Sequence, residues 1–139
     1  MATIRSFEEI ESWKKAREIC MILGELVDKG KFRKSYRLIH QIEGSSGSIM
    51  DNIAEGFERD TKAEFITFLG YSKGSCGELR SQLYRALDRS FISQAEFDTL
   101  RTLALQISGL LQNFISYLQK TNIAGIRKKS EAKTLNFRL

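Results

Sequence analysis

Apolar side chains recur every three or four residues over four long stretches of this chain, and no proline interrupts any of them. Proline removes a backbone donor and clashes with the preceding helical turn, so its absence permits long, unkinked helices. The three-and-four spacing is typical of an amphipathic helix, and no segment alternates as a half-buried strand does. The sequence therefore predicts an all-α protein.

The expected helix boundaries are marked by capping patterns and by glycine. Ser6 with Glu9, Thr61 with Glu64, and Ser93 with Glu96 match the Ser/Thr-x-x-Glu capping box, which satisfies free amides at a helix start. The periodic stretches run from residue 7 to just before Gly30, from about 33 to 58, from Thr61 through Leu87 and from Ser93 to Lys120. Short links between long helices predict an antiparallel, up-down-up-down four-helix bundle over residues 1–120.

The overall composition fits one soluble domain with a tail. A chain of 139 residues can build a single hydrophobic core. Residues 121–139 are basic and lack a sustained amphipathic period, so we expect a disordered tail there. No apolar stretch approaches the roughly 18–20 residues of a membrane span, and the first residues lack a signal-peptide core. These features predict a cytoplasmic protein without a membrane partner, in which the isolated Cys20 and Cys76 are reduced and buried.

Small and polar residues follow one flank of the second and third predicted helices. Ser48, Asn52 and Glu55 are spaced i, i+4 and i+7, and Ser75, Glu78 and Gln82 have a similar spacing one helix later. Half-buried polar groups are costly unless they form hydrogen bonds. We therefore expect the two stripes to face each other, where they either lock the register of the helices or bind a partner.

Glycine is frequent in the same two helices. Gly56, Gly70, Gly74 and Gly77 each lower helix propensity by up to about 1 kcal/mol relative to alanine. Close approach of another backbone explains such a cost. The glycines predict either a tight contact between helices or a contact between subunits.

Trp13, the string Asn52-Ile53-Ala54-Glu55-Gly56, and Gly74-Ser75 with Glu78 together resemble the signature of a known family. It is the family of bacterial four-helix bundle proteins encoded in intervening sequences of 23S ribosomal RNA genes. The resemblance covers about residues 5–120 and implies a homopentameric ring without catalytic activity. A related protein, the accessory variability protein of diversity-generating retroelements, works with a reverse transcriptase and nucleic acid. The resemblance thus implies RNA, DNA or a polymerase as partners.

The basic residues are clustered rather than spread evenly. Between Asp28 and Gln41 the chain carries Lys29, Lys31, Arg33, Lys34 and Arg37 against one acidic residue. In an antiparallel bundle Arg85 and Arg89 return to the same end, and the tail adds a second cluster that includes Arg127, Lys128 and Lys129. Such clusters are typical of proteins that bind phosphate backbones.

The sequence is compatible with three functional interpretations. The clusters favour a non-enzymatic, oligomeric accessory protein that binds RNA or DNA by its backbone and shape. The first alternative is a scaffold for another protein, such as a reverse transcriptase or another polymerase, and the second is a structural ring without a ligand. His40 is the single histidine and has no nucleophile with an orienting partner nearby in the pattern. We therefore predict no enzymatic activity, no cofactor and no metal.

Overall fold

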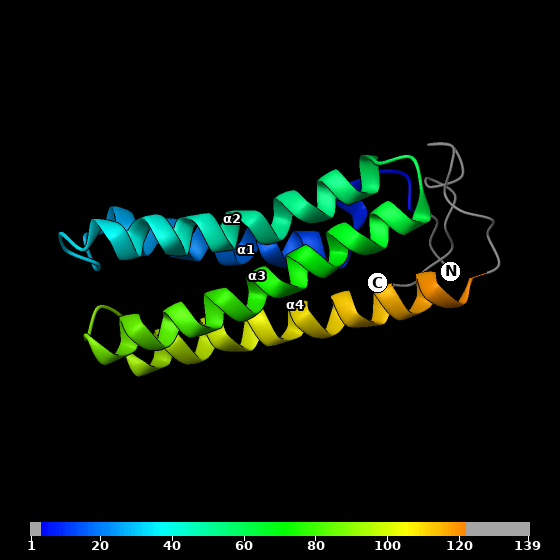
Figure 1. Cartoon of the computed structure of the whole chain (residues 1–139). Coiled ribbons are helices and arrows are strands. Elements are labelled where there is room, and N and C mark those ends of the chain that lie inside the picture. Colours follow the sequence, from blue (N-terminus) through cyan, green and yellow to red (C-terminus); the bar gives the residue numbers. More distant parts are fainter. Residues whose placement is uncertain (1–3, 122–139) are drawn as a thin grey trace.

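The structure, a computed structural model, describes residues 4–121 and consists of four long helices joined by short loops. They are α1 (Glu11–Asp28), α2 (Tyr36–Glu58), α3 (Lys62–Asp88) and α4 (Gln94–Lys120). The connecting loops lie at alternate ends of the molecule, so successive helices run in opposite directions (Figure 1). The predicted antiparallel four-helix bundle is confirmed. None of the helices in the described part of the chain is long and apolar enough to cross a membrane.

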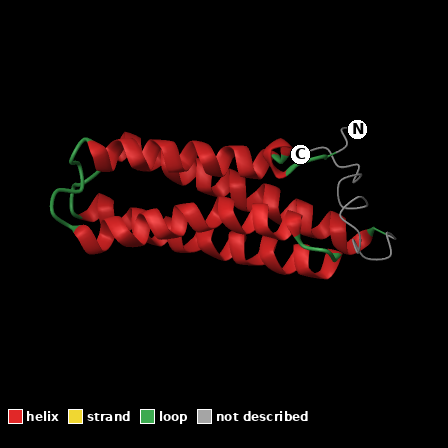
Figure 2. Cartoon of the chain, turned by 90° about the horizontal axis from the view of Figure 1, so that it is seen from above, coloured by secondary structure: helices red, strands yellow, loops and turns green. Residues whose placement is uncertain are grey.

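The core is enclosed by all four helices. α1 packs against α2 and α4, and α3 packs against the same two helices, so the bundle is closed (Figure 2). The largest fully buried side chains include Phe57, Phe65 and Phe114, and the Phe65 ring meets those of Phe57 and Phe114 edge-on at 5.9 and 5.1 Å. The apolar stripes predicted from the sequence therefore form one continuous core.

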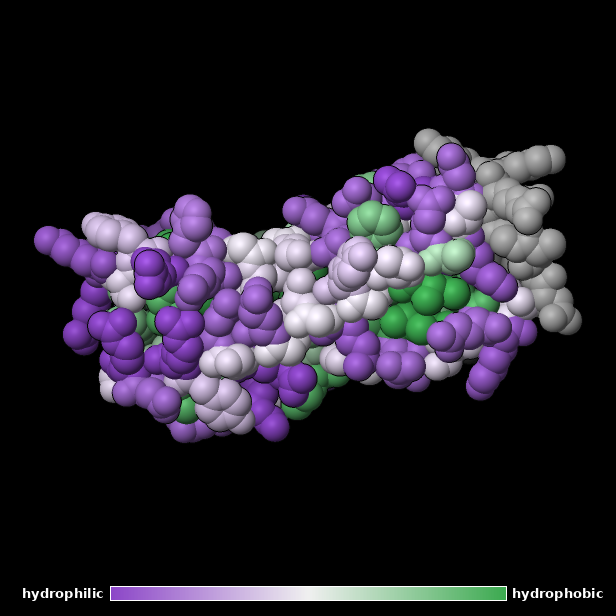
Figure 3. Space-filling model, viewed as in Figure 1, coloured by the Kyte–Doolittle hydropathy of each residue, from purple (hydrophilic) through white to green (hydrophobic). Residues whose placement is uncertain are grey.

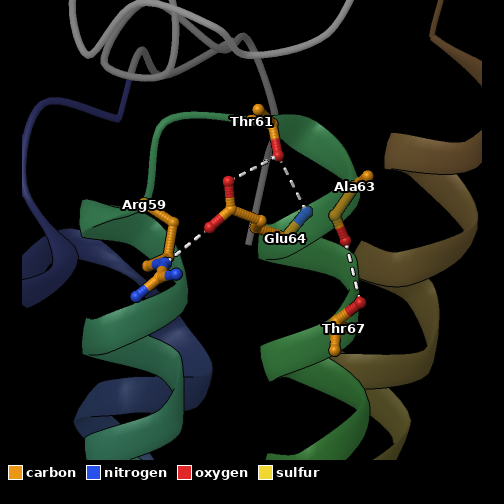
Figure 4. Close-up of polar contacts among 5 residues, drawn as sticks. All are labelled: Arg59, Thr61, Ala63, Glu64 and Thr67. Carbon is orange, nitrogen blue, oxygen red and sulfur yellow. Dashed lines mark hydrogen bonds and ion pairs between the residues drawn. The ribbon is translucent and has the colours of Figure 1, made fainter.

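Two of the three predicted capping sites form. At the start of α4, the Ser93 side chain accepts from the Glu96 amide and Glu96 accepts from the Ser93 amide, a complete capping box. At the start of α3, Thr61 Oγ1 accepts from the Glu64 amide at 3.1 Å and donates to Glu64 Oε1 at 3.0 Å (Figure 4). Arg59 Nε donates to Glu64 Oε2 at 2.6 Å, and this bond holds the pKa of Glu64 below its usual range.

The third predicted capping box, Ser6 with Glu9, was wrong. The segment forms a short 3₁₀ helix, η1 (Phe7–Glu9), and the Ser6 side chain makes no capping hydrogen bond. Glu9 Oε2 instead accepts from the Arg5 amide at 2.9 Å. α1 begins only at Glu11, after the extended backbone of Ile10.

The start of α2 also differs from the expected residue 33. Arg33 has a φ of 53°, in the left-handed region that a right-handed helix excludes. Its amide bonds to the Gly30 carbonyl at 3.0 Å, and the Ser35 amide bonds to the Phe32 carbonyl at 3.1 Å. These turns place the fully buried Phe32 beneath the loop, and α2 starts at Tyr36.

Candidate nucleic-acid interface at one end of the bundle

A polar seam joins α2 to α3 within the otherwise apolar bundle. The seam consists of Ser45, Ser48, Asn52, Ser72, Ser75 and Gln82. Ser45 Oγ donates to Gln82 Oε1 at 2.6 Å, and Ser72 Oγ donates to the Ile49 carbonyl at 2.7 Å, both in the interior. Nearer the surface, Ser75 Oγ donates to Ser48 Oγ at 3.1 Å, and Asn52 Nδ2 donates to Ser48 Oγ at 2.8 Å. The seam therefore connects the two helices at three levels.

The remaining signature residues lie outside the seam. Glu55 and Glu78 are exposed and make no hydrogen bond or ion pair with the rest of residues 4–121, so the two predicted stripes face each other only in part. The Trp13 ring is half-buried and contacts Phe7 edge-on at 5.2 Å, with the Arg17 guanidinium 6.0 Å from its centroid. Trp13 therefore anchors η1 against α1.

Gly56 is required by the close approach of α2 to α3. A Cβ atom at this position would lie 2.7 Å from Phe68 Cβ and 3.1 Å from Phe65 Cδ1. The first atom is fixed directly to the α3 backbone and cannot rotate away. The glycine that ends the Asn-Ile-Ala-Glu-Gly string thus has a packing role inside one chain.

The other three glycines do not share this role. A Cβ at Gly70 or Gly74 would meet no atom within 4 Å, and one at Gly77 would meet only Arg80 Nη2 at an ordinary 3.8 Å. Of the two predicted alternatives, a tight contact between helices of the same chain therefore applies to Gly56 and not to these three glycines. The exposed surface of α3 carries these small residues without an intramolecular reason.

The buried hydrogen bond between Ser45 and Gln82 is expected to stabilise the fold. Ser45→Ala removes the donor to Gln82 Oε1, whose side chain is only 7% exposed. An unsatisfied buried acceptor costs about 1–3 kcal/mol, so the free energy of unfolding is expected to fall by that amount in urea denaturation. Ser81→Ala, on the exposed side of α3 next to Gln82 in sequence, is the control and is expected to leave stability unchanged or slightly raised, since alanine is the better helix former.

Two loops meet at one end of the bundle and begin in the same way. Gly30, two residues after the end of α1, has a φ of 75°, and Ser90, two residues after the end of α3, has a φ of 60°. In each, two amides bond back into the last turn: Gly30 to Val27 and Lys31 to Leu26, Ser90 to Leu87 and Phe91 to Ala86. This is the Schellman arrangement, which satisfies the last carbonyls of a helix. Both loops are therefore fixed to their helices by backbone hydrogen bonds.

Seven basic side chains surround these loops, and all seven are exposed. We call this surface the basic end; it consists of Lys29, Lys31, Arg33, Lys34, Arg37, Arg85 and Arg89. The structure thus brings together the seven basic residues that the sequence assigned to this end. Figure 3 shows hydrophilic side chains over it, and a hydrophobic area between the first turns of α3 and the last turns of α4 at the other end.

Few of these charges are neutralised. Within residues 4–121 Lys29 is the one member in an ion pair, with Glu25 at 3.9 Å. Arg85 Nη1 donates to the amide oxygen of Gln41 at 2.8 Å and Arg89 Nη1 to Ser35 Oγ at 3.2 Å, both neutral partners. These bonds orient the guanidinium groups without cancelling their charge, so the basic end presents a positive field to solvent.

Phe91 orders two of the arginines at this end. Its ring is buried, and its centroid lies 4.5 Å from the Arg89 guanidinium and 5.9 Å from that of Arg33. It also contacts the buried Phe32 at 5.9 Å, which ties the two loops together. Sequence reasoning assigned neither phenylalanine to this role, although an apolar residue one or two positions after a helix-ending turn is a signal for such an anchor.

The predicted tail contacts lie outside the described residues, which end at Thr121, and include Arg127, Lys128 and Lys129. The Thr121 carbonyl accepts from Lys62 Nζ at 3.1 Å, so α4 ends beside the start of α3. That is the end opposite the basic loops (Figure 1). The 27 residues of α4 place Thr121 about 40 Å along the bundle from the basic end.

The two cysteines are both free thiols. Burial raises the pKa of Cys76 to about 12. Cys20 is half-buried rather than buried, and its pKa is also raised, mainly by burial. Because the thiolate is the reactive form, the raised pKa disfavours reaction of both side chains at neutral pH.

Comparisons with known proteins agree on the architecture. The sequence matches the profile of the 23S rRNA-intervening sequence proteins over residues 8–113. The fold is similar to the crystal structure of a protein of unknown function from the S23 ribosomal protein family of Bacteroides thetaiotaomicron. That likeness has a TM-score of 0.69 at 22% identity and covers 79% of this chain and 99% of the other. No curated protein matches the sequence. The profile spans the signature residues of α2 and α3, and the chain belongs to the 23S rRNA-intervening sequence protein family.

Proposed function

We propose that this protein is a non-enzymatic, oligomeric helical bundle that binds the phosphate backbone of RNA or DNA as an accessory factor. The observation that carries the proposal is the basic end, where seven exposed cations from two loops and two helices share one ion pair among residues 4–121. Uncompensated cations repel each other and lose that repulsion when phosphates bind. Release of counterions from the nucleic acid adds the driving force.

The backbone is the favoured ligand because the basic end has no element suited to reading bases in a groove. The exposed cations come from loop residues and helix ends rather than from the face of one protruding helix. Contacts of this kind position a nucleic acid but carry little sequence information. Affinity is therefore expected to depend weakly on sequence and strongly on salt.

The direct test is a fluorescence-anisotropy titration of the full chain against duplex DNA and structured RNA. Each phosphate contact contributes roughly −0.9 to the slope of log affinity against log salt, so six contacts lower affinity about 10³-fold between 50 and 200 mM salt. A steep slope that is the same for unrelated sequences is the expected result. Absence of a complex at about 10 μM protein and 50 mM salt contradicts the proposal.

Self-association is the second part of the proposal and is supported by the α3 surface. Gly70, Gly74 and Gly77 cost helix stability without any close neighbour in their own chain. A second copy packing closely on this surface explains them. Assembly into a ring, for which the family resemblance suggests five copies, brings several basic ends together and multiplies the field that attracts a polyanion.

Gly74→Leu tests this surface. The added side chain has open space in the single chain, so α3 is expected to retain or gain stability while close packing with a second copy is lost. Light scattering on the purified protein is expected to show a lower molar mass, with thermal melting at low concentration unchanged or higher. Gly109→Leu is the matched control, since Gly109 of α4 is also exposed with no atom near its Cβ position. Unchanged mass for Gly74→Leu removes this surface from the assembly.

A protein partner, such as a polymerase, is the alternative supported by a different surface. Trp13 and Met21 line an open groove of about 520 Å³ on α1, and Met21 is exposed. Exposed apolar side chains in a groove suit a protein ligand better than a phosphate backbone. This function takes precedence if the titration above finds no nucleic-acid complex and Met21→Glu abolishes capture of a purified polymerase partner.

A further inference from the structure

A pocket of about 590 Å³ opens at the basic end, between the loop that follows α1 and the loop that follows α3. We call it the interloop pocket. The first loop contributes Lys31 and Arg33, and the second contributes Ser90, Phe91, Ser93 and Gln94. Its volume lies in the range of roughly 300–1,000 Å³ that small-molecule sites occupy. The residues come from two segments about 60 positions apart, so only the folded bundle forms it.

The floor of the pocket is partly apolar, and its rim is cationic. Phe91 and Ile92 are buried beneath it, whereas Lys31 and Arg33 are exposed at its edge. Both loops are fixed by their backbone turns and by the contact between Phe32 and Phe91. A ligand therefore meets a preorganised site that combines positive charge with an apolar surface.

The polar groups that line the pocket differ in how many of their hydrogen-bonding atoms are already engaged. Glu96 also lines it, but one of its oxygens accepts from the Ser93 amide at 2.8 Å, at the positive end of α4. Gln94 Nε2 donates to Asp98 at 2.9 Å, which leaves its amide oxygen as an acceptor. Lys31 and Arg33 have no acidic partner within residues 4–121. The net preference is for an anion that also carries a flat, partly apolar group.

From this geometry we propose that the interloop pocket binds one unpaired nucleotide of a nucleic-acid strand, with its phosphate at Lys31 and Arg33 and its base toward the apolar floor. The inference rests on the proposed function and names its substrate class, a strand with unpaired residues. Phosphates of a duplex lie on a convex surface, and their bases are stacked out of reach, so a duplex cannot fill a concave pocket. An unpaired nucleotide can enter it.

An exposed aromatic ring among the basic residues of the same end supports the same substrate class. Tyr36, at the first turn of α2, is 69% exposed and lies between the basic residues Lys34 and Arg37 in sequence. Stacking of bases on such rings is tolerant of sequence and favours single strands. Tyr36 therefore gives the basic end an exposed ring on which an unpaired base can stack.

The test compares two fluorescent probes that differ almost only in unpaired residues. One is a blunt-ended DNA duplex of about 20 base pairs, and the other is the same duplex with a single-stranded overhang of about three nucleotides. The two probes carry nearly the same number of backbone phosphates, and both are measured at about 50 mM salt. The full chain is expected to bind the overhang probe about tenfold more tightly, because stacking of an unpaired base adds to the backbone contacts.

The key variant is Gln94→Trp, which fills the pocket without changing charge at an exposed first residue of α4. It is expected to reduce binding of the overhang probe to that of the blunt probe and to leave the blunt probe unaffected. Gln119→Trp, an exposed glutamine at the far end of α4, is the matched control and is expected to change neither. A second variant combines Lys31→Gln with Arg33→Asn, since asparagine tolerates the left-handed backbone at position 33. It is expected to weaken binding of the overhang probe more than binding of the blunt probe.

The outcomes separate this proposal from the one on which it rests. Equal binding of both probes, or a loss on Gln94→Trp that is the same for both, overturns the unpaired-nucleotide site while backbone binding stands. Failure of both probes to bind overturns the proposed function and this inference together. Circular dichroism of each variant, with unchanged helical melting, confirms that the bundle is intact.

Discussion

Gly56→Ala is expected to lower the free energy of unfolding by about 1–3 kcal/mol, although alanine is the better helix former. The added methyl group would lie 2.7 Å from Phe68 Cβ, so α2 and α3 must move apart where their contact is closest. That movement disturbs the aromatic contacts of Phe65 with Phe57 and Phe114. Urea denaturation followed by circular dichroism measures the change.

Gly109→Ala provides the matched control for this prediction. Gly109 lies on the exposed side of α4, and a Cβ there would meet no atom within 4 Å. The same chemical change is therefore expected to stabilise the protein by up to about 1 kcal/mol through helix propensity alone. If both variants shift stability in the same direction, the close approach at Gly56 has no energetic role.

Reversing Arg33, Lys34 and Arg37 to glutamate is expected to have the largest effect on nucleic-acid binding, a loss of about 10²-fold or more at 50 mM salt. Three cations of the basic end become anions, and the slope of log affinity against log salt should flatten by about 2.7, since each contact contributes about 0.9. All three side chains are exposed and none forms an ion pair within residues 4–121. The helical fold is thus expected to survive, which circular dichroism checks.

The control for the charge reversal changes the same number of charges elsewhere. Lys14, Lys15 and Arg17 lie in the first two turns of α1, which begins at the opposite end of the bundle. Their reversal to glutamate lowers the net charge by the same amount but leaves the basic end intact. A similar loss of affinity in both triple variants would show that net charge alone, and not the basic end, attracts the nucleic acid.

The basic C-terminal tail is also expected to contribute to nucleic-acid binding. Its basic residues, including Arg127, Lys128 and Lys129, lie beyond Thr121, the last described residue. A truncation after Thr121 removes these basic residues and tests whether they contribute phosphate contacts. Its effect on the salt slope is expected to add to that of the charge reversal, because each lost contact contributes about 0.9 to the slope.

Much of the fold could be predicted because it depends on local patterns. The periodicity of Phe65, Leu69, Cys76, Leu79 and Leu83 identified the buried side of α3, and Ser93 with Glu96 placed the start of α4 within a residue. Ser6 with Glu9 has the same letters but forms a 3₁₀ turn. Extended backbone at Ile10, whose side chain is completely buried, separates that turn from α1. Packing of one buried residue thus prevailed over a local capping preference.

By itself, the sequence determined the number of helices, their approximate ends, the antiparallel order and the residues that gather at the basic end, because helical period, caps and short loops act over a few residues. Only the tertiary structure decided which glycine is a close contact, that Glu55 and Glu78 lie outside the polar seam, and that two loops enclose a pocket over Phe91. These features depend on distances between segments far apart in the chain. The spacing of residues within one helix carries no information about such distances.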